Sequence, residues 1–127
     1  MWIKYQPNPL SRNVDDCTVR ALAKALEIDW ERAYDILTKY GKNMANMPHA
    51  NEVMSAVLRS HGFNRAIIPN RCPDCYTAED FCKDNPYGVY VLGFGDHVAT
   101  VDDGDIYDSW NSSGVVPMFY YYRKDDY

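Results

Sequence analysis

The hydrophobic period of this sequence changes once, near Gly62, from the spacing of a helix to the spacing of a strand. Before that glycine, apolar residues recur every three or four positions, as they do on one face of a helix. After it, they fall in short segments rich in β-branched and aromatic residues, which are typical of strands. Strands and helices do not alternate as they would in a parallel sheet. The sequence therefore predicts an α+β fold in which N-terminal helices pack on an antiparallel β-sheet.

Three helices are expected in the first half of the chain. They are predicted at residues 16–26, 29–41 and 48–61. Asp15 or Asp16 is expected to cap the first and Asp29 the second, because a short carboxylate can accept hydrogen bonds from the free N–H groups of the first turn. Gly41 and Gly62 are expected to end the second and third helices, since glycine adopts without strain the left-handed conformation that often follows a helix.

The second half is expected to form strands around one further short helix. The strands are predicted at residues 63–68, 88–94, 97–101, 106–110 and 115–123, the helix at 77–81, and an extended lead-in at 1–14. Asp103 and Gly104 have the residue types of a two-residue hairpin turn. With these two residues in the loop, His97 faces Trp110 and lies diagonal to Asp108 on the same face of the hairpin.

The net charge of the chain argues against nucleic-acid binding, and the lack of a long apolar run argues against a membrane protein. A length of 127 residues predicts a single domain, 1–127. The net charge of −5 and the absence of a Lys/Arg cluster give no field for a phosphate backbone. No apolar run approaches the ~20 residues of a membrane helix, and the N-terminus lacks the apolar segment of a signal peptide. We expect a cytoplasmic protein that binds neither nucleic acid nor membrane, in an oligomeric state that the sequence leaves open.

Cys17 is the candidate nucleophile because it stands at the predicted start of the first helix. Free N–H groups and the positive end of the helix dipole favour a thiolate there, so its pKa should fall from about 8.5 toward roughly 3.5–7.5. The backbone N–H of Cys17 could also stabilise the oxyanion of an attacked carbonyl. A second oxyanion donor is expected just upstream, with Asn13 as the first candidate and Gln6 as the second.

His97 and Asp108 complete a candidate catalytic triad with Cys17. Their side chains can meet in the predicted hairpin, and a slip of one residue on each strand would bring them directly opposite each other. His97 would accept the thiol proton and later return it to the leaving group, while Asp108 would hold the ring in the useful tautomer. Trp110 is expected to shield this pair from water.

The segment around the histidine and the carboxylate resembles papain-like cysteine peptidases. His97 followed by Asp108-Ser109-Trp110 resembles the histidine and the Asn-Ser-Trp segment of that superfamily, with Asp in place of Asn. The resemblance implies a papain-like fold in miniature. It also implies that an asparagine at position 108 would preserve the fold and much of the activity.

The segment around the cysteine resembles a related group. Asp16-Cys17 is similar to the Asp-Cys of bacteriocin-leader-processing peptidases, which have a similar length and use Cys, His and Asp in this order. The two resemblances cover about residues 6–24 and 88–113. The papain spacing would place the oxyanion residue at Ser11, which is not an amide, and Thr18 replaces the glycine that usually follows Asp-Cys.

These resemblances imply a cysteine-dependent hydrolase that cleaves a peptide or isopeptide bond in a peptide or protein substrate, with an acyl-enzyme intermediate and no cofactor. A transglutaminase or deamidase would use the same residues for acyl transfer. The alternative from a different class is a catalytically inactive papain-fold protein that binds a host partner. The whole chain also looks like short proteins encoded by bacteriophages, which would place it in the cytoplasm of the host.

The remaining cysteines are expected to be reduced, because nothing in the sequence indicates a secreted protein. Cys72, Cys75 and Cys82 lie close together, and His49 or His61 could add a fourth zinc ligand. A second Cys-x-x-Cys or a Cys-His pair at finger spacing is missing from the sequence. We therefore expect a metal-free loop, with a structural zinc site as the alternative.

Overall fold

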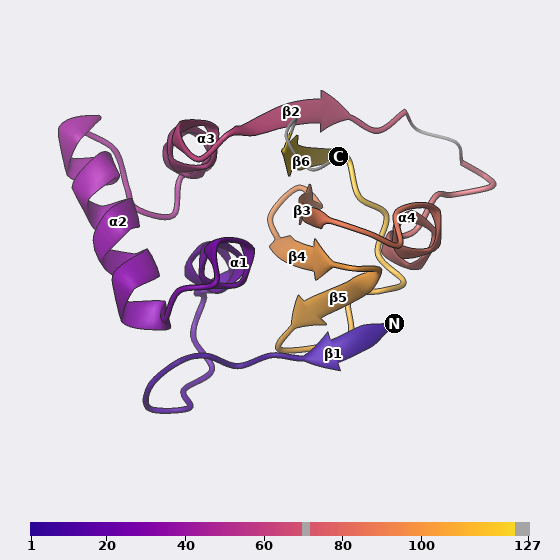
Figure 1. The fold of residues 1–127 in the computed structure, drawn as a ribbon, viewed down its shortest axis with the longest axis horizontal. Helices are drawn as coiled ribbons and strands as arrows, with labels where there is room; N and C mark the ends of the chain where they lie inside the picture. Colours follow the sequence, from indigo (N-terminus) through magenta and orange to yellow (C-terminus); the bar gives the residue numbers. More distant parts are fainter. Residues whose placement is uncertain (70–71, 124–127) are drawn as a thin grey trace.

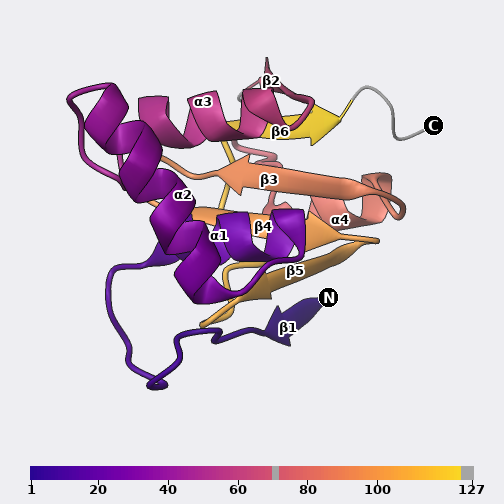
Figure 2. The ribbon, with the colours of Figure 1, turned by 60° about the vertical axis from the view of Figure 1, so that its left-hand side comes forward.

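The computed structural model describes residues 1–69 and 72–123. In this part of the chain, a mixed six-stranded sheet lies between a layer of three helices and a fourth helix on the opposite side. The helices are α1 (Cys17–Leu26), α2 (Trp30–Asn43), α3 (Asn51–Ser60) and α4 (Ala78–Asp84). Helices α1 and α3 pack against the strands on one face, α2 packs against α1 and α3, and α4 lies on the opposite face (Figures 1 and 2). The predicted α+β class is confirmed.

The order of the strands in the sheet is β1-β5-β4-β3-β6-β2. Their bounds are β1 (Trp2–Lys4), β2 (Phe63–Ile67), β3 (Val89–Gly93), β4 (Val98–Asp102), β5 (Asp105–Asp108) and β6 (Phe119–Arg123). Neighbouring strands run antiparallel except at one edge, where β1 runs parallel to β5. The prediction of an antiparallel sheet is therefore wrong at that edge, and the predicted extended lead-in contains a strand.

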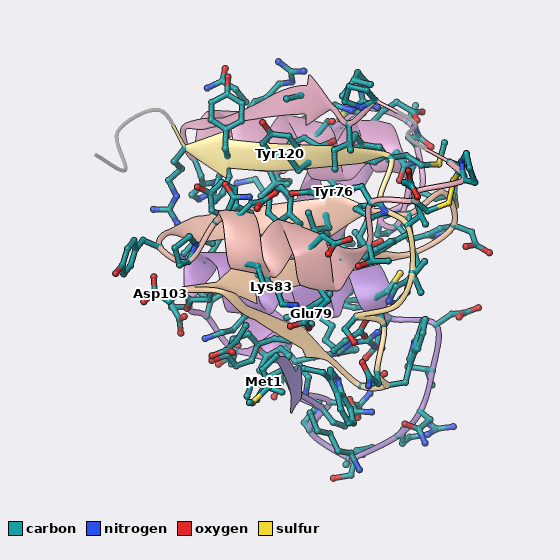
Figure 3. All side chains as sticks on the ribbon, turned by 90° about the vertical axis from the view of Figure 1, so that its right-hand side faces the viewer. Met1, Tyr76, Glu79, Lys83, Asp103 and Tyr120 are labelled. Carbon is teal, nitrogen blue, oxygen red and sulfur yellow. A yellow bond between two sulfur atoms is a disulfide. The ribbon has the colours of Figure 1, made fainter. Side chains whose placement is uncertain are left out.

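Strand β1 is attached to β5 through both backbone and side-chain bonds. The carbonyl of Asp108 accepts hydrogen bonds from the Tyr5 N–H at 2.8 Å and the Trp2 indole at 3.1 Å. Figure 3 faces the α4 side of the sheet, where the Met1 ammonium lies 3.5 Å from the carboxylate of Glu79 on α4. The two hydrogen bonds to the carbonyl of Asp108 fix the end of β5 from outside the hairpin. A parallel partner so short leaves no periodic signal in the sequence.

The β4–β5 hairpin has the predicted register. Thr100 pairs with Tyr107 and Asp102 pairs with Asp105. The two loop residues, Asp103 and Gly104, have φ angles of 48° and 80°. Two successive positive φ angles are the mark of a type I′ turn, whose twist matches that of the flanking strands. The local Asp-Gly signal therefore determines which residues of β4 and β5 face each other.

Helix α1 is buried on nearly all sides, between the sheet and the outer helices. Its apolar residues join α2, α3 and the sheet in one core. That core is made up of Val19, Ala21, Leu22, Ala23, Ala25, Ala33, Leu37, Val53, Met54, Val57, Leu58, Phe63, Val91, Val98, Phe119 and Tyr121. The hydroxyl of Thr100 donates a hydrogen bond of 2.6 Å to the carbonyl of Ala21. The helix is thus held against β4 by packing and by polar contacts.

The predicted helix ends are right in part. Asp29 caps α2 by accepting a hydrogen bond from the backbone N–H of Arg32 at 2.7 Å, as predicted. Asp16 precedes α1, but its carboxylate contacts the side chain of Arg20 instead of capping the helix. Gly41 does not end α2, which continues to Asn43. The glycine at position 41 is explained by the lack of room for a side chain and not by its backbone conformation.

We predict that Gly41→Ala lowers the free energy of unfolding by about 1–3 kcal/mol, as overpacked sites do. A Cβ at Gly41 would lie 2.9 Å from the carbonyl oxygen of Asn46 and 3.2 Å from the nitrogen of Pro48, and backbone atoms cannot move aside easily. Denaturant unfolding would measure the change. Gly114→Ala is the matched control, because a Cβ at Gly114 meets nothing within 4 Å. Equal stabilities of the two variants would contradict the steric explanation.

Candidate active site

The thiol of Cys17 lies on the first residue of α1 and is half-buried. Burial is the largest influence on its pKa and raises it. Hydrogen bonds from His97, the Val98 backbone N–H and Thr18, together with the charge of His97, outweigh burial and lower the pKa of the thiol below its ordinary value. The direction agrees with the expectation from a helix N-terminus, but the partners that produce it lie mostly at the start of β4.

The imidazole of His97 lies between the thiol and a buried carboxylate. His97 directly precedes β4, and Asp108 is the last residue of β5. The ring Nε2 lies 2.6 Å from Asp108 Oδ2, which leaves Nδ1 as the ring nitrogen available to Cys17. Asp108 is 0% exposed. The structure therefore brings the three predicted triad residues together, in the hairpin geometry that the sequence indicated.

The charged forms of Cys17, His97 and Asp108 stabilise one another. Burial lowers the pKa of His97, but contacts with Asp108 and Cys17 raise it to about 9. Burial raises the pKa of Asp108, whereas hydrogen bonds from His97 and Ser112 and the charges of His97 and Arg20 bring it below its ordinary value. Near neutral pH the site therefore favours an imidazolium beside an ionised carboxylate. The same proton distribution favours a thiolate at Cys17.

Trp110 lies against the imidazole, as predicted for a supporting residue. The rings of Trp110 and His97 have centroids 4.9 Å apart, and the ring of Phe94 lies 5.8 Å from the imidazole. The two aromatic rings limit the movement of the imidazole and exclude water from its faces. Trp110 remains 47% exposed, so its other surface is available to a bound substrate.

Two residues in contact with Asp108 were missed by the sequence analysis. Arg20 Nη2 donates to Asp108 Oδ1 at 3.0 Å, and the hydroxyl of Ser112 donates to Oδ2 at 2.7 Å. Arg20 also forms a buried ion pair with Asp16, whose Oδ2 accepts a 2.9 Å hydrogen bond from the indole of Trp30. The signal that could have found Arg20 is a charged residue on an otherwise apolar face of α1, four positions after Asp16.

The two predicted oxyanion residues lie beside Cys17 but play different parts. Gln6 Nε2 donates hydrogen bonds to Asn13 Oδ1 at 3.0 Å and to the carbonyl of Arg12 at 3.3 Å. Both amide protons of Gln6 are therefore engaged, and Gln6 orients Asn13. Asn13 and Gln6 line the same cavity as Cys17. Which of the two would donate to an oxyanion stays a prediction.

Cavities of about 600 and 670 Å³ meet at the thiol, and both are lined by Asp15, Cys17, Asp96 and His97. The first extends past Gln6, Asn13, Val14, Asp16, Arg20, Ser109 and Trp110. The second extends past Thr18, His49, Ala50, Asn51, Gly95 and Val98. His49 precedes α3 and lines a cavity, although it was expected within the helix. The nucleophile thus stands between two open spaces, either of which can receive part of a substrate.

The other cysteines differ from the prediction. Cys72 and Cys75 are joined in a disulfide, so the expectation of reduced thiols is wrong for this pair and they do not form the alternative zinc site. Cys82 lies apart from them on α4, in the core between that helix and the sheet, where burial raises the pKa of its thiol to about 11. In residues 1–69 and 72–123, no group of three or more His, Cys, Asp or Glu side chains is arranged to hold a metal ion.

No helix within the described part of the chain is both long and apolar enough to span a membrane. No protein-family model, curated protein or solved structure matches this chain. The chemistry of the site therefore has to be inferred from its own geometry.

We predict that iodoacetamide alkylates Cys17 with a pH midpoint below the ~8.5 of a free thiol. The thiolate is the reactive form, and the lowered pKa keeps it populated until the pH falls through that value. Cys82 is the internal control, because its raised pKa should delay its reaction to alkaline pH. Peptide mapping by mass spectrometry separates the two rates. A common midpoint near that of free cysteine would contradict the proposed ion pair.

Proposed function

We propose that this protein is a cysteine-dependent amide hydrolase of papain-like type that cleaves a peptide or isopeptide bond. The observation that carries the proposal is the contact of 2.6 Å between His97 and Asp108, beside the thiol of Cys17 at an open cavity. A nucleophile, a base and a group that orients the base are the parts that covalent hydrolysis requires. No metal or cofactor is needed for this chemistry.

In the first half of the proposed reaction, the Cys17 thiolate attacks the carbonyl carbon of the scissile amide. The oxyanion that forms would accept hydrogen bonds from the Cys17 backbone N–H and the amide of Asn13. The imidazolium of His97 then donates its proton to the leaving nitrogen as the C–N bond breaks. The products of this step are a free amine and a thioester on Cys17.

In the second half, neutral His97 accepts a proton from a water molecule, and the resulting hydroxide attacks the thioester carbonyl. The C–S bond breaks, the carboxylic acid leaves, and the proton on the imidazole restores the ion pair with the thiolate. Asp108 remains ionised throughout and stabilises the imidazolium at both stages. After the first half-reaction Cys17 and His97 are both neutral, and after the second they are again a thiolate and an imidazolium.

The two cavities favour hydrolysis of an internal bond over the release of ammonia. A deamidase acts on a terminal amide whose leaving group is only ammonia, whereas a peptide or isopeptide bond carries chain on both sides. Cavities on both sides of Cys17 suit the second kind of substrate. A transglutaminase shares the acyl-enzyme and differs in the nucleophile that resolves it. An inactive binding protein would have no use for a thiol of lowered pKa.

We predict that the purified protein cleaves members of a library of internally quenched peptides, and that Cys17→Ala and His97→Ala lose at least about 10³-fold in rate. Cys82→Ala is the matched control, because that thiol lies in a separate core cluster. Mass spectrometry should detect an acyl group on Cys17. Ammonia release or amine incorporation without cleavage would favour deamidation or transglutamination. An inert thiol with no cleavage would favour the binding protein.

We predict that Asp108→Asn loses stability as well as activity, against the expectation from the papain resemblance. The carboxylate oxygens accept hydrogen bonds from His97, Arg20, Ser112 and the Ser109 N–H, so in the described structure each of these partners is a donor. The amide N–H₂ of asparagine would face donors, and Arg20 would lose one of its two carboxylate partners and keep Asp16. We expect a loss of about 3–5 kcal/mol in denaturant unfolding. Wild-type stability and activity in this variant would support the resemblance.

A further inference from the structure

The carboxylate of Asp108 is shared between two halves of the site. Its Oδ2 faces His97 and Ser112, and its Oδ1 faces Arg20 and the backbone N–H of Ser109 at 2.8 Å. A carboxylate held at both oxygens cannot rotate about its χ2 angle without breaking bonds on each side. The direction of Oδ2, and with it the direction of the imidazole, therefore depends on what holds Oδ1.

The guanidinium of Arg20 connects this carboxylate to the helix that carries the nucleophile. Arg20 is 5% exposed, and its two terminal nitrogens contact different carboxylates, Asp108 and Asp16. Asp16 is joined to Cys17 by a peptide bond. The contacts therefore form a closed ring that passes from Cys17 through His97, Asp108, Arg20 and Asp16 back to Cys17. From Cys17 through His97, Asp108 and Arg20 to Asp16, negative and positive groups alternate when the thiol and imidazole are ionised, and the peptide bond between Asp16 and Cys17 then joins two negative residues.

We propose that Arg20 is a positioning residue that holds Asp108 in the orientation in which His97 faces Cys17. The inference rests on the proposed function for its catalytic meaning, although the geometry can be tested without a substrate. The planar guanidinium fork binds two carboxylates in fixed directions, which the single ammonium of a lysine cannot do. Without the fork, Asp108 Oδ1 loses one of its two donors and keeps the Ser109 N–H, so the carboxylate and the imidazole bonded to it are held less firmly in their direction.

Helix α1 has other attachments that do not pass through Arg20. The hydroxyl of Thr100 bonds the carbonyl of Ala21, Lys24 lies 3.3 Å from Asp102, and Arg123 Nη2 bonds the carbonyl of Ala25 at 3.1 Å. A substitution at Arg20 can therefore disturb the site while the helix stays against the sheet. Arg123 is a suitable control, because it also anchors α1 but lies away from Asp108.

The test is the pH dependence of Cys17 alkylation by iodoacetamide in wild type, Arg20→Lys and Arg123→Lys. Arg20→Lys keeps the positive charge and removes the fork, so it isolates geometry from charge. We expect its midpoint to rise by about one pH unit, which lowers the rate about tenfold below the midpoint and leaves the plateau at alkaline pH unchanged. Arg123→Lys should keep the wild-type midpoint. Circular dichroism and thermal unfolding verify that each variant is folded.

An unchanged midpoint in folded Arg20→Lys, or an equal shift in Arg123→Lys, would overturn the proposal. If Arg20→Lys does not fold, Asp16→Asn decides, because it removes the charge that holds the other end of the guanidinium. A raised midpoint in that variant supports the proposal, and a wild-type midpoint overturns it. Failure of the proposed function is distinguishable, because it would appear in wild type as the absence of peptide cleavage, whatever the variants do.

Discussion

The buried carboxylate of Asp108 is the point at which the separate parts of this structure meet. Its side chain accepts hydrogen bonds from the imidazole of His97, from Arg20 on the first helix and from Ser112 in the loop after β5. Its backbone carbonyl accepts hydrogen bonds from Trp2 and Tyr5 at the N-terminal edge of the sheet. The helix layer, the hairpin and the edge strand are therefore tied to one residue, and the candidate nucleophile is positioned through it.

Such a cluster of buried charges is expensive, because each ion loses several kcal/mol of hydration when it leaves water. Apolar residues of similar volume would often stabilise a fold as well or better. The ionic ring instead fixes the orientation of these side chains, because each carboxylate and the guanidinium bind their partners only in certain geometries. The proposed chemistry needs an imidazole held within a narrow range of angles, and this need is a physical reason to retain Asp16, Arg20 and Asp108 in the interior.

The hairpin and the starts of the first two helices could be predicted because their signals are local. Asp103 and Gly104 specify a turn, the turn specifies a register, and the register places His97 near Asp108. Strand β1 was missed because its three residues pair with a distant strand and carry no period of their own. The Cys72–Cys75 disulfide was missed because the prediction relied on the absence of a secretory segment, which says nothing of how close two thiols lie.

The α+β order of elements, the hairpin register and the thiol at a helix start follow from local signals in the sequence. Periodicity, capping and turn types act over a few residues, so they can be recognised without knowing the rest of the fold. Arg20 bridges Asp16, four residues before it, and Asp108, 88 residues away, only because the fold brings the three side chains together. A guanidinium selects its partners by distance and direction in space, and those are defined only once the helix has packed on the sheet.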